Sequence, residues 1–226
     1  MHVELIRHTP APESLVALGA RLCYSKTTLD DLQERVSSQD QTEFIGRIMS
    51  MGHDSVLEHA SFTFLIEDVS RVLLAQITRH RLASFSVQSQ RYCGVDPTDV
   101  VIPQSIVDKR FAGSIKALLR HANDVYQAMV QEGVPEEDAR YFTFQAGKTR
   151  FLVTMNVREL RHFFRLRTCN RAQWEIRYLA DEMLRICKAT APLLFDDAGC
   201  ACMVGKPCPE GKKSCGKPRM HREVGK

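Results

Sequence analysis

Apolar residues recur every three or four positions through most of the chain, a spacing that places them on one face of an α-helix. Helices are predicted around six segments: 15–22, 44–49, 69–77, 111–129, 160–164 and 174–186. Two of them carry capping signals, because Asp40 precedes Glu43, and Asn156 precedes Glu159, by three residues. Pro135 and the acidic residues after it predict one more helix, since proline suits the first turn and carboxylates suit its positive end.

Two other segments carry the pattern of strands. Phe62, Phe64 and Ile66 alternate with polar or smaller neighbours, which predicts a strand with one buried face. Residues 149–155 predict a second short strand. Helices interspersed with a few strands indicate a mixed α/β (α+β) fold, and we expect helices around a small, mostly antiparallel sheet. We assign this single domain to residues 1–198 and treat residues 199–226 as a tail.

The composition fits one folded domain. The 226 residues are 44% hydrophobic and 26% charged, so the chain can build a core and wholesale disorder is excluded. No uncharged apolar run reaches the roughly 18 residues that a membrane span needs. The first residues, Met1 to Leu5, lack the basic stretch and apolar block of a signal peptide. We therefore expect a cytoplasmic protein without a membrane partner.

Charge and cysteine are both concentrated near the C-terminus. Residues 199–226 hold seven basic and two acidic residues, a formal charge of +5, whereas residues 1–198 hold 24 basic and 25 acidic residues. Half of the eight cysteines lie in this tail: Cys200, Cys202, Cys208 and Cys215. Without a secretory signal, buried thiols or metal ligands are favoured over a disulfide framework.

Two interpretations of the tail stay open. Four thiols within sixteen residues suit tetrahedral zinc or an iron–sulfur cluster, although C-x-C with wide later spacing is not a standard ligand pattern. Otherwise the tail is a mobile basic extension with incidental thiols. No other metal site is predicted, because His53 and His59 are six residues apart and do not share a helical face.

The densest polar segment is residues 79–92, with three arginines, one histidine and three serines. The chain has no G-x-G-x-x-G, Walker A or G-x-S-x-G motif, so arginines and backbone donors would have to hold any nucleotide. We interpret the serine-rich part as a loop suited to a phosphate or carboxylate. The alternative is that Arg79 and Arg81 only complement a helix C-terminus while the serines form turns.

Three blocks of the sequence together resemble the flavin-dependent thymidylate synthases. They are GHDSVLEH with FTF in residues 52–64, RHR with SQRY in residues 79–92, and NVR, LR and AQWE in residues 156–175. The blocks occur in the family's order and at compatible spacing, and the resemblance extends over about residues 1–195. Three blocks in register are much more specific than any single motif.

The resemblance implies an enzyme that methylates dUMP to dTMP, with methylenetetrahydrofolate as carbon donor and FAD, reduced by NADPH, as hydride carrier. It also implies a homotetramer with active sites at subunit interfaces. The expected partners are therefore dUMP, the folate and further copies of the chain, and no nucleic acid is expected.

By position, the resemblance assigns residues to each ligand. For FAD these are His53, Ser55, Arg79, His80, Arg81, Asn156, Val157, Arg158 and His162. For dUMP they are Gln76, Arg79, Val87, Gln88, Ser89, Gln90, Arg91, Arg140 and Arg167. Val87 stands where many members carry Glu or Gln, so a contact there must come from its backbone or apolar atoms. His59 is expected to be structural.

The resemblance makes Arg167 the catalytic residue, facing the pyrimidine. Methylation needs electron density at the fifth carbon of uracil, so negative charge must be stabilised on the ring nitrogen and carbonyls. A fixed guanidinium at that edge does so, and one preorganised donor contributes about 3 kcal/mol. We interpret Ser89 as a positioning residue and not a nucleophile, because no triad is apparent and the flavin route needs no covalent enzyme adduct.

Two other classes of function were weighed. A basic, cysteine-rich tail together with arginine clusters is also compatible with a nucleic-acid-binding protein whose tail binds metal. Against this, the body is nearly neutral and its arginines are interleaved with apolar helix faces. A purely structural or oligomerising domain would leave the arginine-rich segment as solvated surface.

Overall fold

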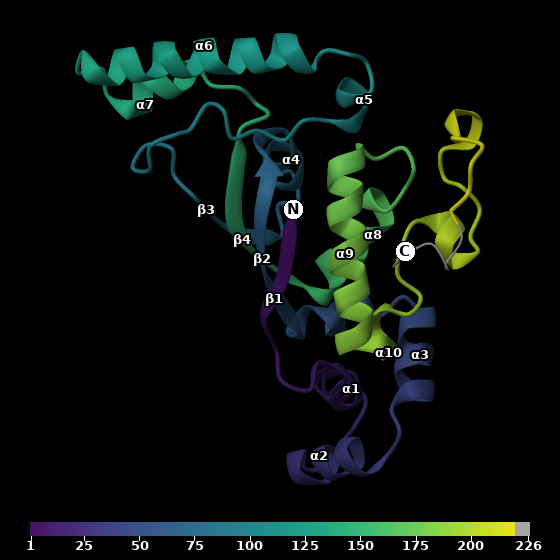
Figure 1. Ribbon diagram of the computed structural model, residues 1–226. Coiled ribbons are helices and arrows are strands. Elements are labelled where there is room, and N and C mark those ends of the chain that lie inside the picture. The colour runs from purple at the N-terminus through teal and green to yellow at the C-terminus, as the bar shows by residue number, and fades with distance from the viewer. Residues whose placement is uncertain (220–226) are drawn as a thin grey trace. The chain divides into compact units, whose positions relative to one another are not determined.

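A computed structural model describes residues 1–219 and has a mixed α+β architecture (Figure 1). Its four strands form one antiparallel sheet in the order β1-β2-β4-β3. The strands are β1 (His2–His8), β2 (Ser61–Ser70), β3 (Ala83–Val87) and β4 (Lys148–Asn156). The predicted fold class is confirmed, as are the two predicted strands, which are the central β2 and β4. Residues 220–226 of the predicted tail lie outside the described part of the chain.

Helices make up most of the rest of the chain. The α-helices are α1 (Pro12–Leu22), α2 (Leu29–Ser38), α3 (Thr42–Ser50), α4 (Arg71–Ile77), α5 (Gln104–Val107), α6 (Ala112–Gln131), α7 (Glu136–Ala139), α8 (Val157–Arg167), α9 (Trp174–Thr190) and α10 (Pro192–Phe195). Short 3₁₀ helices are η1 (Asp54–His59), η2 (Arg140–Phe142), η3 (Ala201–Val204) and η4 (Gly211–Lys213). Each predicted helical segment contains a helix, whereas α2, α5 and α10 were not predicted. Within residues 1–219, none of these helices has the length and apolarity to span a membrane.

The chain divides into two compact units. The smaller unit comprises residues 1–2, 65–79 and 85–152. The larger unit comprises residues 3–64, 80–84 and the chain from 153 onward. Strands β2 and β4 each run from one unit into the other, so both units contain part of the sheet.

Phenylalanine side chains form the core of the larger unit. Phe62 and Phe64 are fully buried on β2, as are Phe163 and Phe164 on α8. Phe195 of α10 lies between them, with its ring edge-on to Phe62 at 5.5 Å and to Phe164 at 6.0 Å. Helix α8 packs against α9 and η1 in this unit, and α1 packs against α2 and α3. The core thereby fixes α8, which carries many of the predicted site residues.

Helix α8 begins at a cap that the sequence predicts. The Asn156 side-chain oxygen accepts a hydrogen bond from the Glu159 backbone N–H at 2.9 Å. The carboxylate of Glu159 does not complete a capping box, because it points to another residue described below. At α3 the predicted cap is shifted by one residue: Gln41 is the N-cap, and Asp40 accepts hydrogen bonds from the backbone and hydroxyl of Thr42.

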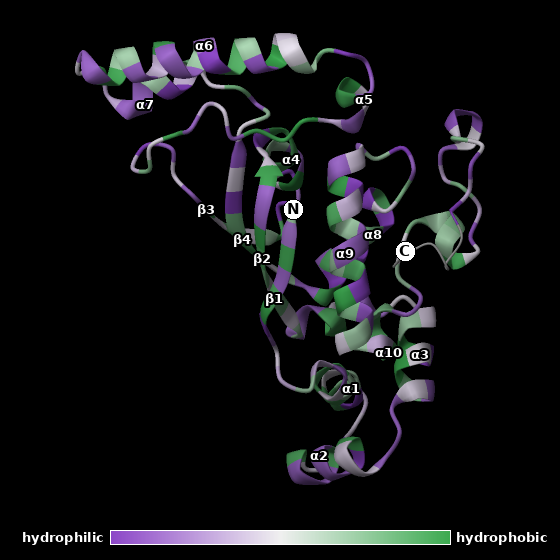
Figure 2. Ribbon diagram, in the orientation of Figure 1, coloured by the Kyte–Doolittle hydropathy of each residue, from purple (hydrophilic) through white to green (hydrophobic). Residues whose placement is uncertain are grey.

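The smaller unit contains the longest helix, α6. Only Tyr126 of this helix is buried, and its hydroxyl accepts a hydrogen bond from the Val95 N–H. One stripe along the helix carries three exposed apolar side chains at intervals of seven residues. They are Phe111, which is the N-cap residue, Leu118 and Val125. Figure 2 shows apolar and polar residues interleaved along α6. The predicted apolar face therefore exists, but this single chain leaves the stripe of Phe111, Leu118 and Val125 exposed.

One prediction about local structure is wrong. The serine-rich segment was interpreted as a loop, but Ala83–Val87 form the edge strand β3, and only the residues after Val87 form a loop. Ser84 and Ser86 alternate with the less accessible Ala83 and Phe85, so the serines line the exposed face of the strand. Val69 also belongs to β2 and not to the helix predicted to include it.

Candidate active site

A buried chain of hydrogen bonds connects three side chains at the inner face of α8. His80 Nδ1 lies 2.8 Å from a carboxylate oxygen of Glu159, and both side chains are buried. The Nε–H of Arg167 donates to His80 Nε2 at 3.2 Å. Glu159 and Arg167 lie two turns apart on α8, while His80 enters from the segment that follows α4. The structure thus brings predicted residues His80 and Arg167 into contact and adds Glu159.

These contacts define the protonation state of His80. Because Arg167 can only donate, His80 Nε2 must be the unprotonated acceptor, and Nδ1 carries the hydrogen that is donated to Glu159. Burial lowers the pKa of His80 below its ordinary value, against the opposing effect of the hydrogen bond to Glu159, and the positive charge of Arg167 lowers it further. The imidazole is therefore neutral at physiological pH and accepts a hydrogen bond from the guanidinium.

His162 lies next to this chain. Its ring is 5.9 Å from the His80 ring, and its Nδ1 lies 2.9 Å from a terminal nitrogen of Arg165. Potential ligand atoms of His80, Glu159 and His162 lie within 4.8 Å of one another. Both nitrogens of His80 are already used by Glu159 and Arg167, so this group acts as a hydrogen-bond network and not as a metal site.

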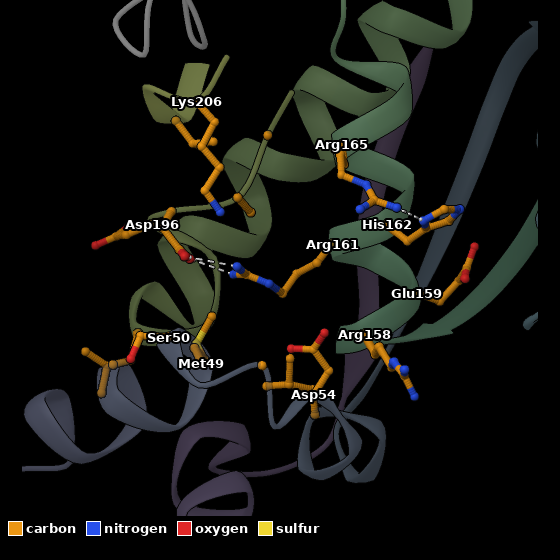
Figure 3. A pocket seen from close by; sticks show the side chains of 18 of the residues that line it. Met49, Ser50, Asp54, Arg158, Glu159, Arg161, His162, Arg165, Asp196 and Lys206 are labelled. Carbon is orange, nitrogen blue, oxygen red and sulfur yellow. Dashed lines mark hydrogen bonds and ion pairs between the residues drawn. The ribbon is translucent and has the colours of Figure 1, made fainter. Parts of the chain in front are cut away.

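An open groove of about 1200 Å³ runs along α8 in the larger unit. Arg158, His162 and Arg165 line it from α8, and Lys206 lines it from the tail (Figure 3). Arg161 spans part of the groove as a bidentate partner of Asp197, at 2.7 and 3.1 Å. Its lining carries charges of both signs, because Asp54, Glu159, Asp196 and Asp197 line the groove together with the basic residues. The volume exceeds the roughly 300–1,000 Å³ of ordinary ligand pockets, which is room enough for an extended dinucleotide such as FAD.

The other residues predicted to contact FAD belong to the larger unit, except Arg79. Ser55 and Arg158 are exposed, and Arg158 is paired with Glu58. His53 is exposed, with its ring edge-on to Tyr24 at 6.3 Å. The remaining members of the set differ in burial: Arg81 is exposed, Asn156 caps α8, Val157 is fully buried, and Arg79 is exposed in the smaller unit.

Most residues predicted to contact dUMP belong to the smaller unit. Arg91 Nε lies 2.5 Å from a carboxylate oxygen of Glu137, and Arg140 Nε donates to the Glu137 backbone carbonyl at 3.1 Å. Both of these arginines, which the resemblance assigns to dUMP, therefore contact Glu137 of α7. Gln76 lies on α4, where its amide donates to the Val72 carbonyl.

The loop after β3 is held by its own polar groups. The Ser89 hydroxyl accepts a hydrogen bond from the Arg91 N–H at 3.1 Å, and the Ser89 carbonyl accepts one from the Cys93 N–H. The Gln88 N–H donates to the Arg150 carbonyl. The side chain and the carbonyl of Ser89 therefore both stabilise the loop. Val87, at the end of β3, and Gln90 flank this turn.

Two further charged residues near Arg91 and Arg140 were not predicted to belong to the site. Glu137 was assigned only to a helix terminus, yet its carboxylate neutralises Arg91. Arg71, at the start of α4, has its pKa lowered by partial burial and by the nearby charge of Arg140. In the sequence, Arg71 is marked only as a basic residue that follows the predicted strand, which does not indicate a role in the site. An anion bound here would relieve the repulsion between Arg71 and Arg140.

Comparisons with known proteins identify the family. A family model described as thymidylate synthase complementing protein matches residues 4–193. The chain is 51% identical to the flavin-dependent thymidylate synthase of Geobacter sulfurreducens, with 99% of both chains covered. The enzyme of the same name from Clostridium tetani is 43% identical over 98% of this chain and 96% of the relative.

The chain belongs to the flavin-dependent thymidylate synthases. A third relative, from Pyrococcus furiosus, is 43% identical but covers 81% of this chain and 78% of its own length. The predicted family and enzyme class are confirmed, and the nucleic-acid-binding and purely structural alternatives are not supported. The family match of this flavin-dependent thymidylate synthase ends before residue 199, so the cysteine-rich tail lies outside it.

Proposed function

We propose that this flavin-dependent thymidylate synthase converts dUMP to dTMP by reductive methylation, with methylenetetrahydrofolate as the carbon donor and NADPH as the reductant. The observation that carries the mechanism is the hydrogen-bond chain from Glu159 through His80 to Arg167. FAD, when bound, supplies the hydride-transfer chemistry. The side chains of the protein bind the reactants, orient them and stabilise charge.

Arg167 is the proposed catalytic residue. Its Nε–H bond to neutral His80 restrains the guanidinium plane, because His80 is itself restrained by the buried carboxylate of Glu159. An arginine oriented in this way stabilises negative charge on the pyrimidine without first reorganising. It stays protonated at working pH, so its role is electrostatic and not acid–base.

Arg91, Arg140 and the N–H groups of residues 88–91 are the proposed phosphate donors. Glu137 holds Arg91 and, through its carbonyl, Arg140 at the same place on α7. A phosphate dianion would compete with the Glu137 carboxylate for Arg91, because both accept charge-assisted hydrogen bonds. Gln76, Arg79, Val87, Gln88, Ser89 and Gln90 would complete the nucleotide site.

The groove along α8 is the proposed FAD site within this chain. Arg158 and His162 line it directly, and Arg165 adds a cation that the resemblance did not assign. Guanidinium groups suit the pyrophosphate of a dinucleotide. His53, Ser55, Arg79, His80, Arg81, Asn156 and Val157 are proposed to provide its remaining contacts, some of them from neighbouring subunits.

We also propose that the enzyme is a homotetramer with active sites at its interfaces. The exposed stripe of Phe111, Leu118 and Val125 supports this, because an uncovered apolar helix face of this kind is typical of a subunit contact.

The proposed activity can be tested on the purified protein. It should be yellow, release FAD on denaturation, and oxidise NADPH only when dUMP and methylenetetrahydrofolate are both present, with dTMP as product. Growth rescue of a thymidine-requiring strain would test the same activity in cells. Purified, FAD-loaded protein that forms no dTMP would overturn the proposal.

A further inference from the structure

The cysteine-rich tail is held against the segment that follows α8. Thr168 makes two hydrogen bonds to it: its hydroxyl accepts from the Cys200 N–H at 2.8 Å, and its carbonyl accepts from the Arg219 guanidinium at 2.6 Å. Arg171 and Asn170 donate to backbone carbonyls between these two points. The part of the tail up to Arg219 is therefore connected to residues 168–171 by several hydrogen bonds.

The tail has little core of its own. Cys200, Met203 and Arg219 are buried, whereas residues 205–218 are all exposed. A segment of this length without buried apolar side chains gains almost no stability from packing. Small segments of this kind are commonly stabilised by a disulfide or a metal ion. Because Cys200 and Arg219 both bind Thr168, the exposed residues between them form a loop whose two ends lie close together.

Two thiols in this loop are already close together. Cys200 Sγ and Cys202 Sγ are 3.5 Å apart, with Cys200 buried and Cys202 partly buried. Two sulfur ligands on tetrahedral zinc, each about 2.3 Å from the metal, lie roughly 3.8 Å from one another. The pair is therefore close to the spacing that zinc requires. Cys208 and Cys215 lie on the exposed part of the same loop.

Backbone N–H groups point at two of the sulfurs. The Arg219 N–H donates to Cys202 Sγ at 3.3 Å, and the Lys217 N–H donates to Cys215 Sγ at 3.4 Å. Gly216, with φ of 67°, lies between Cys215 and Lys217 and lets the backbone turn there. Such donors stabilise sulfur ligands in their anionic form. The +5 charge of residues 199–226 would offset the two negative charges of a zinc ion bound by four thiolates.

We propose that Cys200, Cys202, Cys208 and Cys215 bind one zinc ion, which fixes the tail against the end of α8. Among residues 1–219, the tail thiols do not form a group of three within 4.8 Å, so binding would draw Cys208 and Cys215 to the Cys200–Cys202 pair. Four Zn–S bonds form, four thiol protons are released, and no electrons are transferred. The site is structural, because four protein ligands leave no open position.

Metal analysis of the full-length holoenzyme tests this proposal directly. The protein is purified without a histidine tag, and its zinc and iron are measured by mass spectrometry beside its FAD content. We expect about one zinc per chain, the stoichiometry of a four-cysteine site. Absence of zinc, or iron with acid-labile sulfide in its place, would overturn the proposal. FAD content and dTMP formation are measured separately, so the two proposals can fail independently.

Single substitutions identify the ligands. Cys202→Ser and Cys208→Ser should each lose bound zinc or weaken its affinity by at least tenfold in a chelator competition. Cys208 is exposed, so its substitution leaves the packed core unchanged. Cys23→Ser is the matched control, because Cys23 is also exposed but lies outside the tail. Unchanged zinc affinity in both tail variants would contradict the assignment.

Cobalt substitution counts the sulfur ligands. Co²⁺ in place of zinc should give the intense visible bands of a tetrahedral thiolate site, which lie to the red of flavin absorption and remain measurable in the holoenzyme. The bands should weaken or shift in Cys208→Ser and persist in Cys23→Ser. Weak octahedral bands in the parent protein, or a Cys200–Cys202 disulfide found by mass spectrometry of the purified enzyme, would refute zinc binding.

Discussion

The most consequential residues are the three that form the chain from Glu159 to Arg167. A buried carboxylate is costly unless it is paired, and here His80 provides the hydrogen-bond donor. The same imidazole then has one nitrogen left as an acceptor, which receives Arg167. Each member thus fixes the orientation of the next. The guanidinium is preorganised by residues that lie beneath it and do not need to touch the substrate.

Replacing Arg167 should affect the reaction more than flavin binding. Arg167→Ala is expected to lower kcat by about 10²–10³-fold, the usual cost of removing one preorganised donor of this kind. FAD content per chain should stay within twofold of the parent protein. Steady-state kinetics and FAD released on denaturation check the two quantities. Arg185→Ala, an exposed arginine on α9, is the control, and equal activity of the two variants would remove Arg167 from the active site.

The lowered pKa of His80 predicts a specific pH dependence of stability. Below its ordinary pKa of 6.5 an unfolded His80 binds a proton, whereas the folded residue stays neutral until its own lower pKa is reached. The free energy of unfolding therefore falls as the pH decreases through this window, by up to about 1.4 kcal/mol per pH unit.

Urea unfolding between about pH 8 and pH 5.5 measures this slope. His80→Asn should reduce it, while His121→Asn, at an exposed position on α6, should leave it unchanged. Equal slopes in the parent and His80→Asn proteins would contradict the assignment of a neutral, buried imidazole.

The sequence identified the candidate cations of the site better than their partners. Arg91 and Arg167 were assigned because they lie in blocks that resemble a family, and Arg140 was assigned by its position in the same resemblance. Glu137 and Glu159 were placed at helix starts, which is correct, but a cap signal does not reveal where a carboxylate points. Their pairing with Arg91 and His80 joins positions 46 and 79 residues apart in the chain, and no local pattern encodes such a contact.

At the scale of elements, the central strands were predictable and the edge strands were not. Strands β2 and β4 have neighbours on both sides, and their residues alternate strictly between buried and accessible along most of their length. Strands β1 and β3 are the edges of the sheet, and neither has a buried residue. Alternation is visible in a sequence only when one face of the strand is buried. Backbone hydrogen bonding to a neighbouring strand leaves no comparable pattern of side chains in the sequence.

Helix α8 provides a test of the predicted cap. Asn156→Ala removes the oxygen that accepts the Glu159 N–H and should lower the free energy of unfolding by about 1 kcal/mol. Asn156→Asp keeps an acceptor at the same place and should stay within a few tenths of a kcal/mol of the parent protein. Urea unfolding of the FAD-free proteins measures both. If the two variants were equally destabilised, the cap would not account for the loss.

At the scale of the whole molecule, the exposed stripe of Phe111, Leu118 and Val125 is the main support for the proposed assembly. Phe111 is 56% exposed and Leu118 is 53% exposed, although both lie on the apolar side of a twenty-residue helix. A second copy of the chain, contributing a similar face, would bury both stripes. This arrangement is also what the proposed interface sites require.

Disrupting this stripe should weaken the oligomer. Leu118→Glu places a charge in the middle of the proposed contact, where its desolvation is unfavourable, and should shift the protein to smaller species. Light scattering after size-exclusion chromatography measures the mass. Gln127→Glu adds the same charge at an exposed polar position of α6 and is the control. An unchanged mass for Leu118→Glu would place the subunit contact elsewhere.

Helix α8 has a consequence for inhibition. Glu159 and Arg167 contact His80, while Arg158, His162 and Arg165 line the groove together with Glu159. Both sets belong to one rigid helix of eleven residues, so a rotation about its axis moves them together. A small molecule that displaces α8 would therefore misalign the proposed catalytic arginine and the proposed FAD groove at once.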